Sequence, residues 1–263
     1  QLSTKVGRLL APGAAPDPAA MGWPDALPFQ PDFDYTYDGI RRSFEDSQQR
    51  LGLDRIDILY VHDIGVVTHG DDNAAHMRDL EQGGYRALDE LRRAGRVGAI
   101  GLGVNESAAC LQALEIGDWD VFLLAGRYTL LEQDPLDDLL PACAARGTSI
   151  VVGGPFNSGV LVGGTMWNYA PAPEEILKRV RAIAGVCAAH DVPLPAAALQ
   201  FPLGHAGVCS VIPGLRSRDE LVQTLDWARV RIPDALWSAL KTRGLLRADA
   251  PVPDGNPFTG ETA

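Results

Sequence analysis

Two kinds of hydrophobic pattern alternate along this chain. Short runs rich in β-branched residues predict strands, whereas longer segments with apolar positions every three or four residues predict amphipathic helices. The strands are expected at Leu2–Val6, Ile56–His62, Ala99–Val104, Val121–Tyr128, Ser149–Pro155 and Cys209–Pro213. The helices are expected at about Tyr37–Leu51, Ala75–Ala94, Ser107–Leu114, Pro135–Arg146, Glu174–His190, Arg218–Trp227 and Pro233–Thr242. This order is typical of βαβ units that form a parallel sheet.

The sequence predicts fewer strands than a closed barrel of this length would need. A length of 263 residues fits one large α/β domain over residues 1–263. A closed (β/α)8 TIM barrel has about 250 residues and needs eight parallel strands, two more than the pattern predicts. The sequence also begins at Gln1, directly before an apolar strand. We therefore expect a (β/α)8 barrel from which the first two βα units are absent.

Two ionisable residues stand where predicted strands end. Lys5 lies at the end of the first strand and His62 at the end of the second. Functional groups of a parallel barrel gather at the carboxyl ends of its strands. The sequence therefore predicts that Lys5 and His62 belong to one site.

Composition and charge indicate which kinds of molecule the protein is expected to bind. Hydrophobic residues make up 46% of the chain and charged residues 22%, which are ordinary values for a globular protein. The formal net charge of −11 repels phosphate-rich partners, which argues against nucleic acid and anionic membranes. A nucleotide cofactor stays compatible, because one phosphate site needs only a few backbone amides and one or two arginines. The sequence leaves the oligomeric state open.

Cysteine and histidine spacing argues against a metal site. Four cysteines are scattered with no CxxC pair, and the five histidines form no HExxH motif. We expect the cysteines to be buried or half-buried free thiols of a reducing, cytoplasmic compartment. The given sequence shows no signal-peptide pattern and no apolar run of about 18 residues.

Two long segments that follow predicted strands interrupt the alternation. Leu9–Phe33 is rich in proline and carries Trp23 and Phe29. It is read either as a rigid surface excursion or as a lid that gives apolar walls to a substrate pocket. Asn157–Pro173 carries Trp167 and Tyr169 and could fold over a cofactor.

Several motifs together resemble the aldo-keto reductase family over essentially the whole chain. The segment from Ser43 to His62 resembles the central signature of that family, and Ser3-Thr4-Lys5 resembles the strand that carries its catalytic lysine. Further motifs, in family order, are Gly101-x-Gly103-Val104-Asn105-Glu106, Arg127-Tyr128-Thr129-Leu130-Leu131 and Val211-Ile212-Pro213-Gly214. The run Val61-His62-Asp63-Ile64-Gly65 is similar to a branch of sugar 1-dehydrogenases and pyridoxal 4-dehydrogenase.

The resemblance implies hydride transfer between a nicotinamide and a carbonyl or alcohol carbon. It implies that Lys5 tunes the pKa of a proton-donating tyrosine and that His62 orients the substrate oxygen. An ammonium beside a phenol favours phenolate, which brings a pKa near 10 toward the working pH. The tyrosine and aspartate of the family precede its lysine strand, and Tyr35 and Tyr37 are interpreted as packing residues at a helix start.

The resemblance also places a cofactor site. Asn105 takes the place of a residue that binds the nicotinamide amide, while Gly153 stands where many relatives stack a tyrosine on the ring. The predicted pyrophosphate loop contains Phe156, Asn157, Ser158, Gly159 and Leu161. The predicted adenosine end contains Gly214, Arg216, Arg218 and Glu220.

A carboxylate near the ribose repels a 2′-phosphate, so Glu220 favours NAD, while Arg216 and Arg218 keep NADP open. Glu220 therefore predicts a preference for NAD, and the resemblance to the sugar and pyridoxal dehydrogenases implies oxidation of a cyclic hemiacetal to a lactone, with L-fucose ahead of pyridoxal as substrate. The enzymatic alternative is general aldehyde or ketone reduction. The non-enzymatic alternative is a nucleotide-binding regulatory barrel.

Overall fold

The computed structural model describes residues 1–13, 17, 25 and 27–259. They fall into two compact units, each described by itself below. Unit 1 comprises residues 1–104 and 108–122, and unit 2 comprises residues 105–107 and 123–263. Six strands follow the order β1-β4-β5-β6-β7-β10 in one sheet, and β6 contributes to both units.

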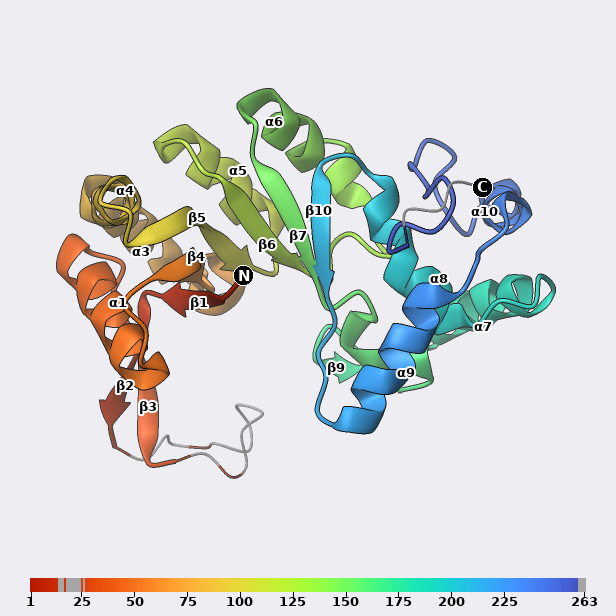
Figure 1. The fold of residues 1–263 in the computed structure, drawn as a ribbon, viewed down its shortest axis with the longest axis horizontal. Coiled ribbons are helices and arrows are strands. Elements are labelled where there is room, and N and C mark those ends of the chain that lie inside the picture. Colours follow the sequence, from red (N-terminus) through yellow and green to blue (C-terminus); the bar gives the residue numbers. More distant parts are fainter. Residues whose placement is uncertain (14–16, 18–24, 26, 260–263) are drawn as a thin grey trace. The chain divides into compact units, whose positions relative to one another are not determined.

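Unit 1 is built around three parallel strands and the beginning of a fourth (Figure 1). They are β1 (Ser3–Val6), β4 (Ile56–His62), β5 (Val97–Val104) and β6 (Val121–Ala125). Its helices are α1 (Tyr37–Leu51), α2 (Val66–His69), α3 (Asn73–Asp79), α4 (Tyr85–Arg93) and most of α5 (Ser107–Ile116), with a 3-10 turn at Gly70–Asp72 and a π turn at Leu80–Gly84. Register places Lys5 beside Tyr60 and His62 beside Gly103.

Helix α1 shows how local chemistry fixes an element next to the predicted site. The Thr36 side chain accepts a hydrogen bond from the Gly39 amide, and Gly52 ends the helix in the left-handed conformation. Ile40 and Phe44, four residues apart, are buried on one face of the helix. The apolar stripe of the sequence is therefore the stripe that packs into the core of unit 1.

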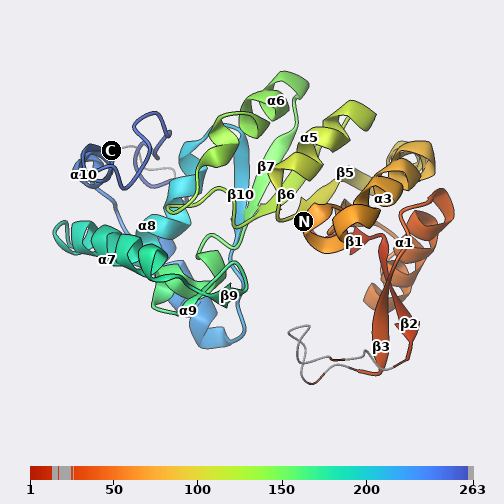
Figure 2. The same ribbon diagram turned by 180° about the vertical axis from the view of Figure 1, so that it is seen from behind.

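Unit 2 combines the end of β6 with β7 (Ser149–Gly153) and β10 (Val208–Ile212), and the latter two are parallel (Figure 2). A small antiparallel hairpin contains β8 (Met166–Trp167) and β9 (Ala170–Pro171). The helices are α6 (Leu139–Arg146), α7 (Glu174–Ala188), α8 (Leu194–Gln200), α9 (Arg218–Arg229) and α10 (Asp234–Thr242), with 3-10 turns at Asp134–Leu136, Asn157–Val162 and Phe201–Gly204.

The prediction of an α/β fold with a parallel sheet is confirmed, and the strands differ from expectation at their ends. β6 ends at Ala125 rather than Tyr128 because Gly126 turns the chain at φ 69°. β7 ends at Gly153 rather than Pro155 because Gly154 has φ 58°. Glycine adopts this left-handed conformation without the steric cost that other residues carry.

The predicted long segment Leu9–Phe33 contains regular structure at its two ends. It begins and ends in an antiparallel hairpin, in which β2 (Arg8–Pro12) pairs with β3 (Phe29–Phe33). The hairpin explains why apolar residues occur at both ends of the segment. Residues 14–16, 18–24 and 26 lie outside the described part of the chain.

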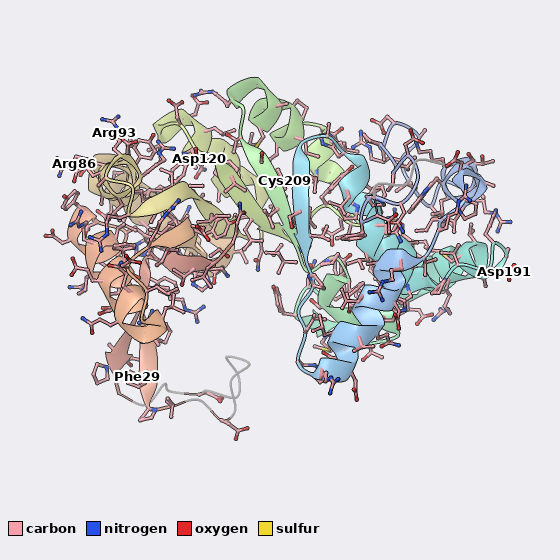
Figure 3. The ribbon with its side chains drawn as sticks, in the orientation of Figure 1. Phe29, Arg86, Arg93, Asp120, Asp191 and Cys209 are labelled. Carbon is pink, nitrogen blue, oxygen red and sulfur yellow. The ribbon has the colours of Figure 1, made fainter. Side chains whose placement is uncertain are left out.

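The expectation for the cysteines is wrong at one position. All four thiols are free; Cys110, Cys143 and Cys187 are buried, but Cys209 is exposed on β10 (Figure 3). Burial raises the pKa of the Cys143 thiol to about 12, which makes it a poor nucleophile. A cytoplasmic location stays a prediction. In the described residues, we find no helix with both the length and the apolar character that crossing a bilayer requires.

Candidate active site

The structure brings Lys5 and His62 together within unit 1. Both lie toward the carboxyl ends of adjacent parallel strands, and Lys5 Nζ is 3.4 Å from His62 Nε2. Both side chains are half-buried. A lysine and an imidazole thus lie side by side, partly shielded from water, as expected for residues at the ends of adjacent parallel strands.

Two further charged groups complete this cluster, and the sequence interpretation did not include them. Asp63 Oδ2 lies 3.2 Å from His62 Nε2 and 3.3 Å from Arg8 Nη1. Asp63 follows the strand-end histidine at φ 52°, a conformation that non-glycine residues rarely adopt. In the sequence, Asp63 could have been recognised as a candidate site residue because it directly follows His62. Arg8 arrives from β2, an element that the hydrophobic pattern did not predict.

Burial controls the ionisation of the cluster. Desolvation lowers the pKa of Lys5, and the nearby Asp63 carboxylate partly opposes this effect. Desolvation, together with the positive charges of Lys5 and Arg8, lowers the pKa of His62 to about 3. His62 is therefore a neutral imidazole at physiological pH. Desolvation also raises the pKa of Asp63, and Lys5 and Arg8 oppose that shift.

The two tyrosines near the start of α1 have structural partners. Tyr35 is fully buried, and its hydroxyl donates to the His62 carbonyl oxygen at 2.7 Å and lies 2.9 Å from His69 Nε2. Burial raises the pKa of Tyr35, so its hydroxyl holds its proton. Tyr37 donates to Glu90 Oε2 at 2.6 Å. These contacts agree with the interpretation of both residues as packing groups, and Tyr35 also fixes the backbone that carries His62.

The predicted pyrophosphate loop lies in unit 2 and has an unusual backbone. Asn157, Ser158 and Gly159 have φ values of 45°, 56° and 98°, and Phe156 before them is near the right-handed region. Successive amides in such mixed conformations form concave sites for anions. Leu161 is buried beneath the turn, whereas Ser158 is exposed. The concave backbone and the amides of this loop thus fit a phosphate group.

Other predicted cofactor residues lie in the same unit. Asn105 follows β5 and is half-buried. Phe156 packs edge-on against Trp227, with ring centroids 5.8 Å apart. A side chain at Gly153 would meet Leu123 Cδ1 at 3.2 Å and Ala125 Cβ at 3.4 Å. This tight packing explains why no aromatic side chain occupies position 153.

The predicted adenosine end surrounds the start of α9. Ser217 caps the helix by accepting from the Glu220 amide at 3.1 Å, and the Glu220 carboxylate accepts from the Arg216 amide at 2.7 Å. The Arg216 guanidinium also donates to Glu220 Oε1 at 2.7 Å. These bonds hold the pKa of Glu220 below its usual value. Gly214 is exposed, and a side chain there would meet no atom within 4 Å.

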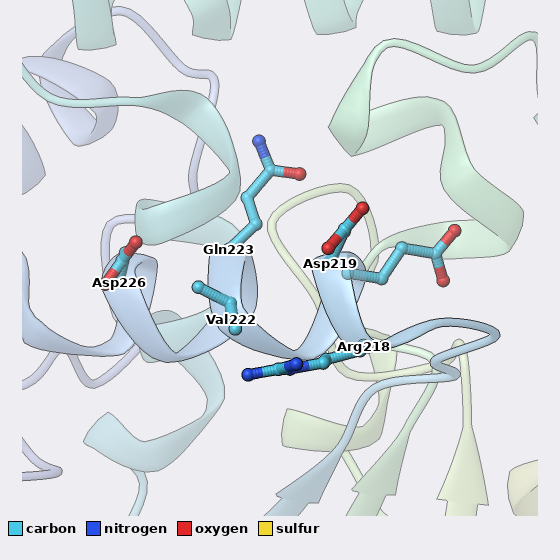
Figure 4. A pocket seen from close by; sticks show the side chains of 6 residues that line it. Arg218, Asp219, Val222, Gln223 and Asp226 are labelled. Atoms are coloured by element: carbon cyan, nitrogen blue, oxygen red, sulfur yellow. The ribbon is translucent and has the colours of Figure 1, made fainter.

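A pocket opens on α9 beside these residues (Figure 4). It is lined by Arg218, Asp219, Glu220, Val222, Gln223 and Asp226. Three of these groups are carboxylates and one is a guanidinium. Arg218 is therefore the cation of this surface, since Arg216 is already paired with Glu220.

Of the two predicted substrate residues, Phe29 falls within the described part of the chain. Phe29 is on the β2–β3 hairpin and is 39% exposed (Figure 3). Trp23 lies outside the described residues. Their substrate roles stay predictions. Within the described ranges, we find no cluster of three or more histidine, cysteine or acidic residues that could hold a metal ion.

Comparison with known proteins places the chain in a family of oxidoreductases. The family model described as "Aldo/keto reductase family" matches residues 2–242. The chain therefore belongs to the aldo/keto reductase family. It is an oxidoreductase of the kind that acts on CH–OH groups, in a family that uses nicotinamide cofactors.

Two curated relatives narrow the comparison. Pyridoxal 4-dehydrogenase of Microbacterium luteolum is 46% identical over 259 residues, which covers 93% of this chain and 76% of the relative. D-threo-aldose 1-dehydrogenase of a Pseudomonas species is 41% identical over 257 residues, which covers 93% of this chain and 75% of the relative. Both lie in the branch that the sequence motifs indicate.

Two solved structures share the fold. An aldo-keto reductase of Bacillus halodurans in its holo form has a TM-score of 0.67 at 20% identity and covers 95% of this chain and 74% of its own. Glycerol dehydrogenase of Gluconobacter oxydans has the same TM-score at 17% identity and covers 96% and 74%. Aldo-keto reductases of this kind are (β/α)8 barrels, which agrees with the predicted fold class.

Proposed function

We propose that this protein is an NAD-preferring dehydrogenase that oxidises a cyclic hemiacetal to a lactone. The observation that carries the proposal is the approach of Lys5 Nζ to His62 Nε2 at 3.4 Å, at strand ends of an aldo/keto reductase sheet. When bound, the nicotinamide cofactor supplies the hydride acceptor. The protein then has to orient the hemiacetal and promote removal of its hydroxyl proton.

The chemistry assigned to each residue follows from its ionisation. The neutral His62 imidazole hydrogen-bonds the hemiacetal oxygen and orients the carbon from which hydride leaves. By the family resemblance, the hydroxyl proton passes to the family's tyrosine in its phenolate form, and the Lys5 ammonium favours that phenolate. The Asp63 carboxylate opposes the lowering of the Lys5 pKa that burial causes. Removal of either Lys5 or His62 would therefore act on the chemical step.

The substrate class rests on the relatives and on the polarity of the cluster. An aldose carries several hydroxyls, which suit the donors and acceptors that Arg8 and Asp63 present beside His62. We therefore propose an aldose such as L-fucose as the first substrate. Pyridoxal is the second candidate, because pyridoxal 4-dehydrogenase, at 46% identity, is a relative at least as similar as D-threo-aldose 1-dehydrogenase, at 41%.

The preference for NAD rests on charge at α9. The three carboxylates of the pocket in Figure 4 would repel the 2′-phosphate of NADP. The Glu220 carboxylate also occupies the Arg216 guanidinium, which leaves Arg218 as the available cation. Free ribose hydroxyls are compatible with this arrangement.

The test is turnover of L-fucose and of pyridoxal, each with NAD and with NADP, with product analysis for the lactone. We expect reduced nicotinamide and lactone to form in equal amounts, faster with NAD. Reduction of simple aldehydes without oxidation of either hemiacetal would favour the general reductase. Cofactor binding without turnover of any substrate would favour the regulatory barrel.

A further inference from the structure

One carboxylate in unit 2 joins three separate segments. Glu132 Oε2 accepts from Arg127 Nη1 at 2.7 Å, just after the end of β6. Glu132 Oε1 accepts from Asn157 Nδ2 at 3.2 Å, in the predicted pyrophosphate loop, and from Trp167 Nε1 at 3.1 Å, in the β8–β9 hairpin. The Glu132 side chain is 15% exposed, so these bonds are made largely away from water.

Two of the three segments that Glu132 joins, the loop and the hairpin, carry backbone strain. Asn157 and Ser158 in the loop have positive φ, and so do Asn168 and Tyr169 in the hairpin. The left-handed region is unfavourable for a non-glycine residue, so four such residues need compensating contacts. The described residues show such contacts: the Tyr169 amide donates to Ser158 Oγ at 3.1 Å, and Asn157 Nδ2 donates to the Gly126 carbonyl at 3.1 Å.

Arg127 extends the connection, because both of its terminal nitrogens donate within unit 2. Its second terminal nitrogen, Nη2, donates to Asn168 Oδ1 in the hairpin, while Nη1 is paired with Glu132. The guanidinium is therefore committed to two contacts within the protein. Its charge offsets that of Glu132, so the carboxylate does not place an uncompensated negative charge beside an anion-binding loop.

We propose that Glu132 is a positioning residue that holds the loop Asn157–Val162 and the β8–β9 hairpin in the conformation that binds the cofactor pyrophosphate. The proposal rests on the proposed function, in which that loop binds a dinucleotide. Glu132 acts through Asn157, Trp167 and Arg127 rather than on the reacting atoms. Its removal should therefore weaken cofactor binding and spare the chemical step.

The principal variant is Glu132→Gln. Glutamine keeps the length of the side chain but has one oxygen in place of two. It therefore cannot accept from Arg127 and from the Asn157–Trp167 side at once, and its amide group faces donors on one of the two sides. We expect the Kd for NAD to rise by about tenfold or more, with kcat at saturating NAD within about twofold of the wild-type value. Without cofactor, amide hydrogen exchange should increase over residues 157–171.

The matched control is Asp89→Asn on α4. Asp89 is 16% exposed and pairs with Arg92 at 2.8 Å and with Arg93 at 2.8 Å, so it resembles Glu132 in burial and partners. It lies in unit 1, outside the loop and hairpin. Its loss should lower the melting temperature without changing the Kd for NAD. A change in Kd that merely follows lost stability would appear in both variants.

A milder variant, Trp167→Phe, covers the case in which Glu132→Gln does not fold. It removes only the indole donor to Glu132 and should raise the Kd for NAD about threefold. An unchanged Kd in either folded variant would overturn the inference. Failure of the wild-type protein to bind NAD or NADP would instead overturn the proposed function, so the two failures are distinguishable.

Discussion

At the scale of the residue, the candidate site is a set of charges held out of water. Lys5, His62, Asp63 and Arg8 are linked by contacts of 3.2 to 3.4 Å. Because they are half-buried, each interaction is stronger than it would be at a free surface. The substitution of one member should therefore affect the others, and the reaction should respond more than the fold does.

Lys5→Met tests the role of the ammonium. The variant keeps most of the apolar side-chain volume but has no positive charge to favour the phenolate form of the tyrosine that accepts the hydroxyl proton. We expect turnover of L-fucose to fall by at least about 100-fold while the Kd for NAD is nearly unchanged. Lys178→Met, on the exposed surface of α7, is the control and should retain full activity. Near-normal turnover of Lys5→Met would remove the lysine from the mechanism.

The depressed pKa of His62 predicts a dependence of stability on pH. The folded value is about 3 and the ordinary value is 6.5, so between them the unfolded chain binds more protons than the folded one. Stability contributed by neutral His62 is therefore present above about pH 6.5 and is lost as the pH falls toward about 3. Denaturant unfolding of the wild type and of His62→Gln across this range should show a steeper loss in the wild type. Parallel curves would contradict the assignment.

At the scale of the element, close strand packing limits substitution in the sheet. A side chain at Gly101 on β5 would lie 1.5 Å from the Val121 carbonyl oxygen on β6, and backbone cannot move aside easily. We expect Gly101→Ala to destabilise the protein by at least about 1–3 kcal/mol. Gly185→Ala in α7 meets no atom within 4 Å and should be neutral or stabilising. Equal melting temperatures for the two variants would contradict this packing.

The start of α9 predicts a shift in cofactor preference. Glu220→Arg replaces a carboxylate by a cation, so NADP should improve relative to NAD by about 1–3 kcal/mol if the guanidinium reaches the 2′-phosphate. Because Glu220 also accepts from the Arg216 amide just before α9, Glu220→Gln is the control, since its side-chain oxygen can still accept from that amide. Its shift should be in the same direction and smaller.

A wild-type protein that prefers NADP about tenfold would overturn the charge argument. It would assign the phosphate contact to Arg218 or to Arg216. The ratio of kcat/KM for the two cofactors decides between these outcomes.

The elements that could be predicted are those with a clear period. Tyr37–Leu51 was predicted at its observed bounds because a cap, an apolar stripe and a terminal glycine coincide. Leu194–Gln200 was missed because it lies between prolines and is buried over consecutive residues, which erases the amphipathic pattern. The region Ala75–Ala94 is interrupted by a π turn where Gly84 packs against the Tyr35 carbonyl, a tertiary contact that has no local signal.

At the scale of the whole molecule, the order of the strands was the main basis for predicting which residues form the site. Lys5 and His62 could be paired because adjacent parallel strands end at one edge. Arg8 and Glu132 could not be found in this way, since each reaches its partner from a turn or hairpin whose path depends on tertiary packing. The comparisons then added the family and the two classes of relative.

The central claim is hydride transfer from a hemiacetal carbon, and isotope transfer tests it most directly. L-fucose deuterated at C1 is incubated with the wild-type protein and NAD, and the reduced cofactor is analysed by mass spectrometry and NMR. The account predicts one deuterium at the nicotinamide C4 and formation of the lactone. Pyridoxal deuterated at its hemiacetal carbon should give the same label if it is the better substrate. Failure of both deuterated substrates to label the cofactor, while NAD binds normally, would contradict the account.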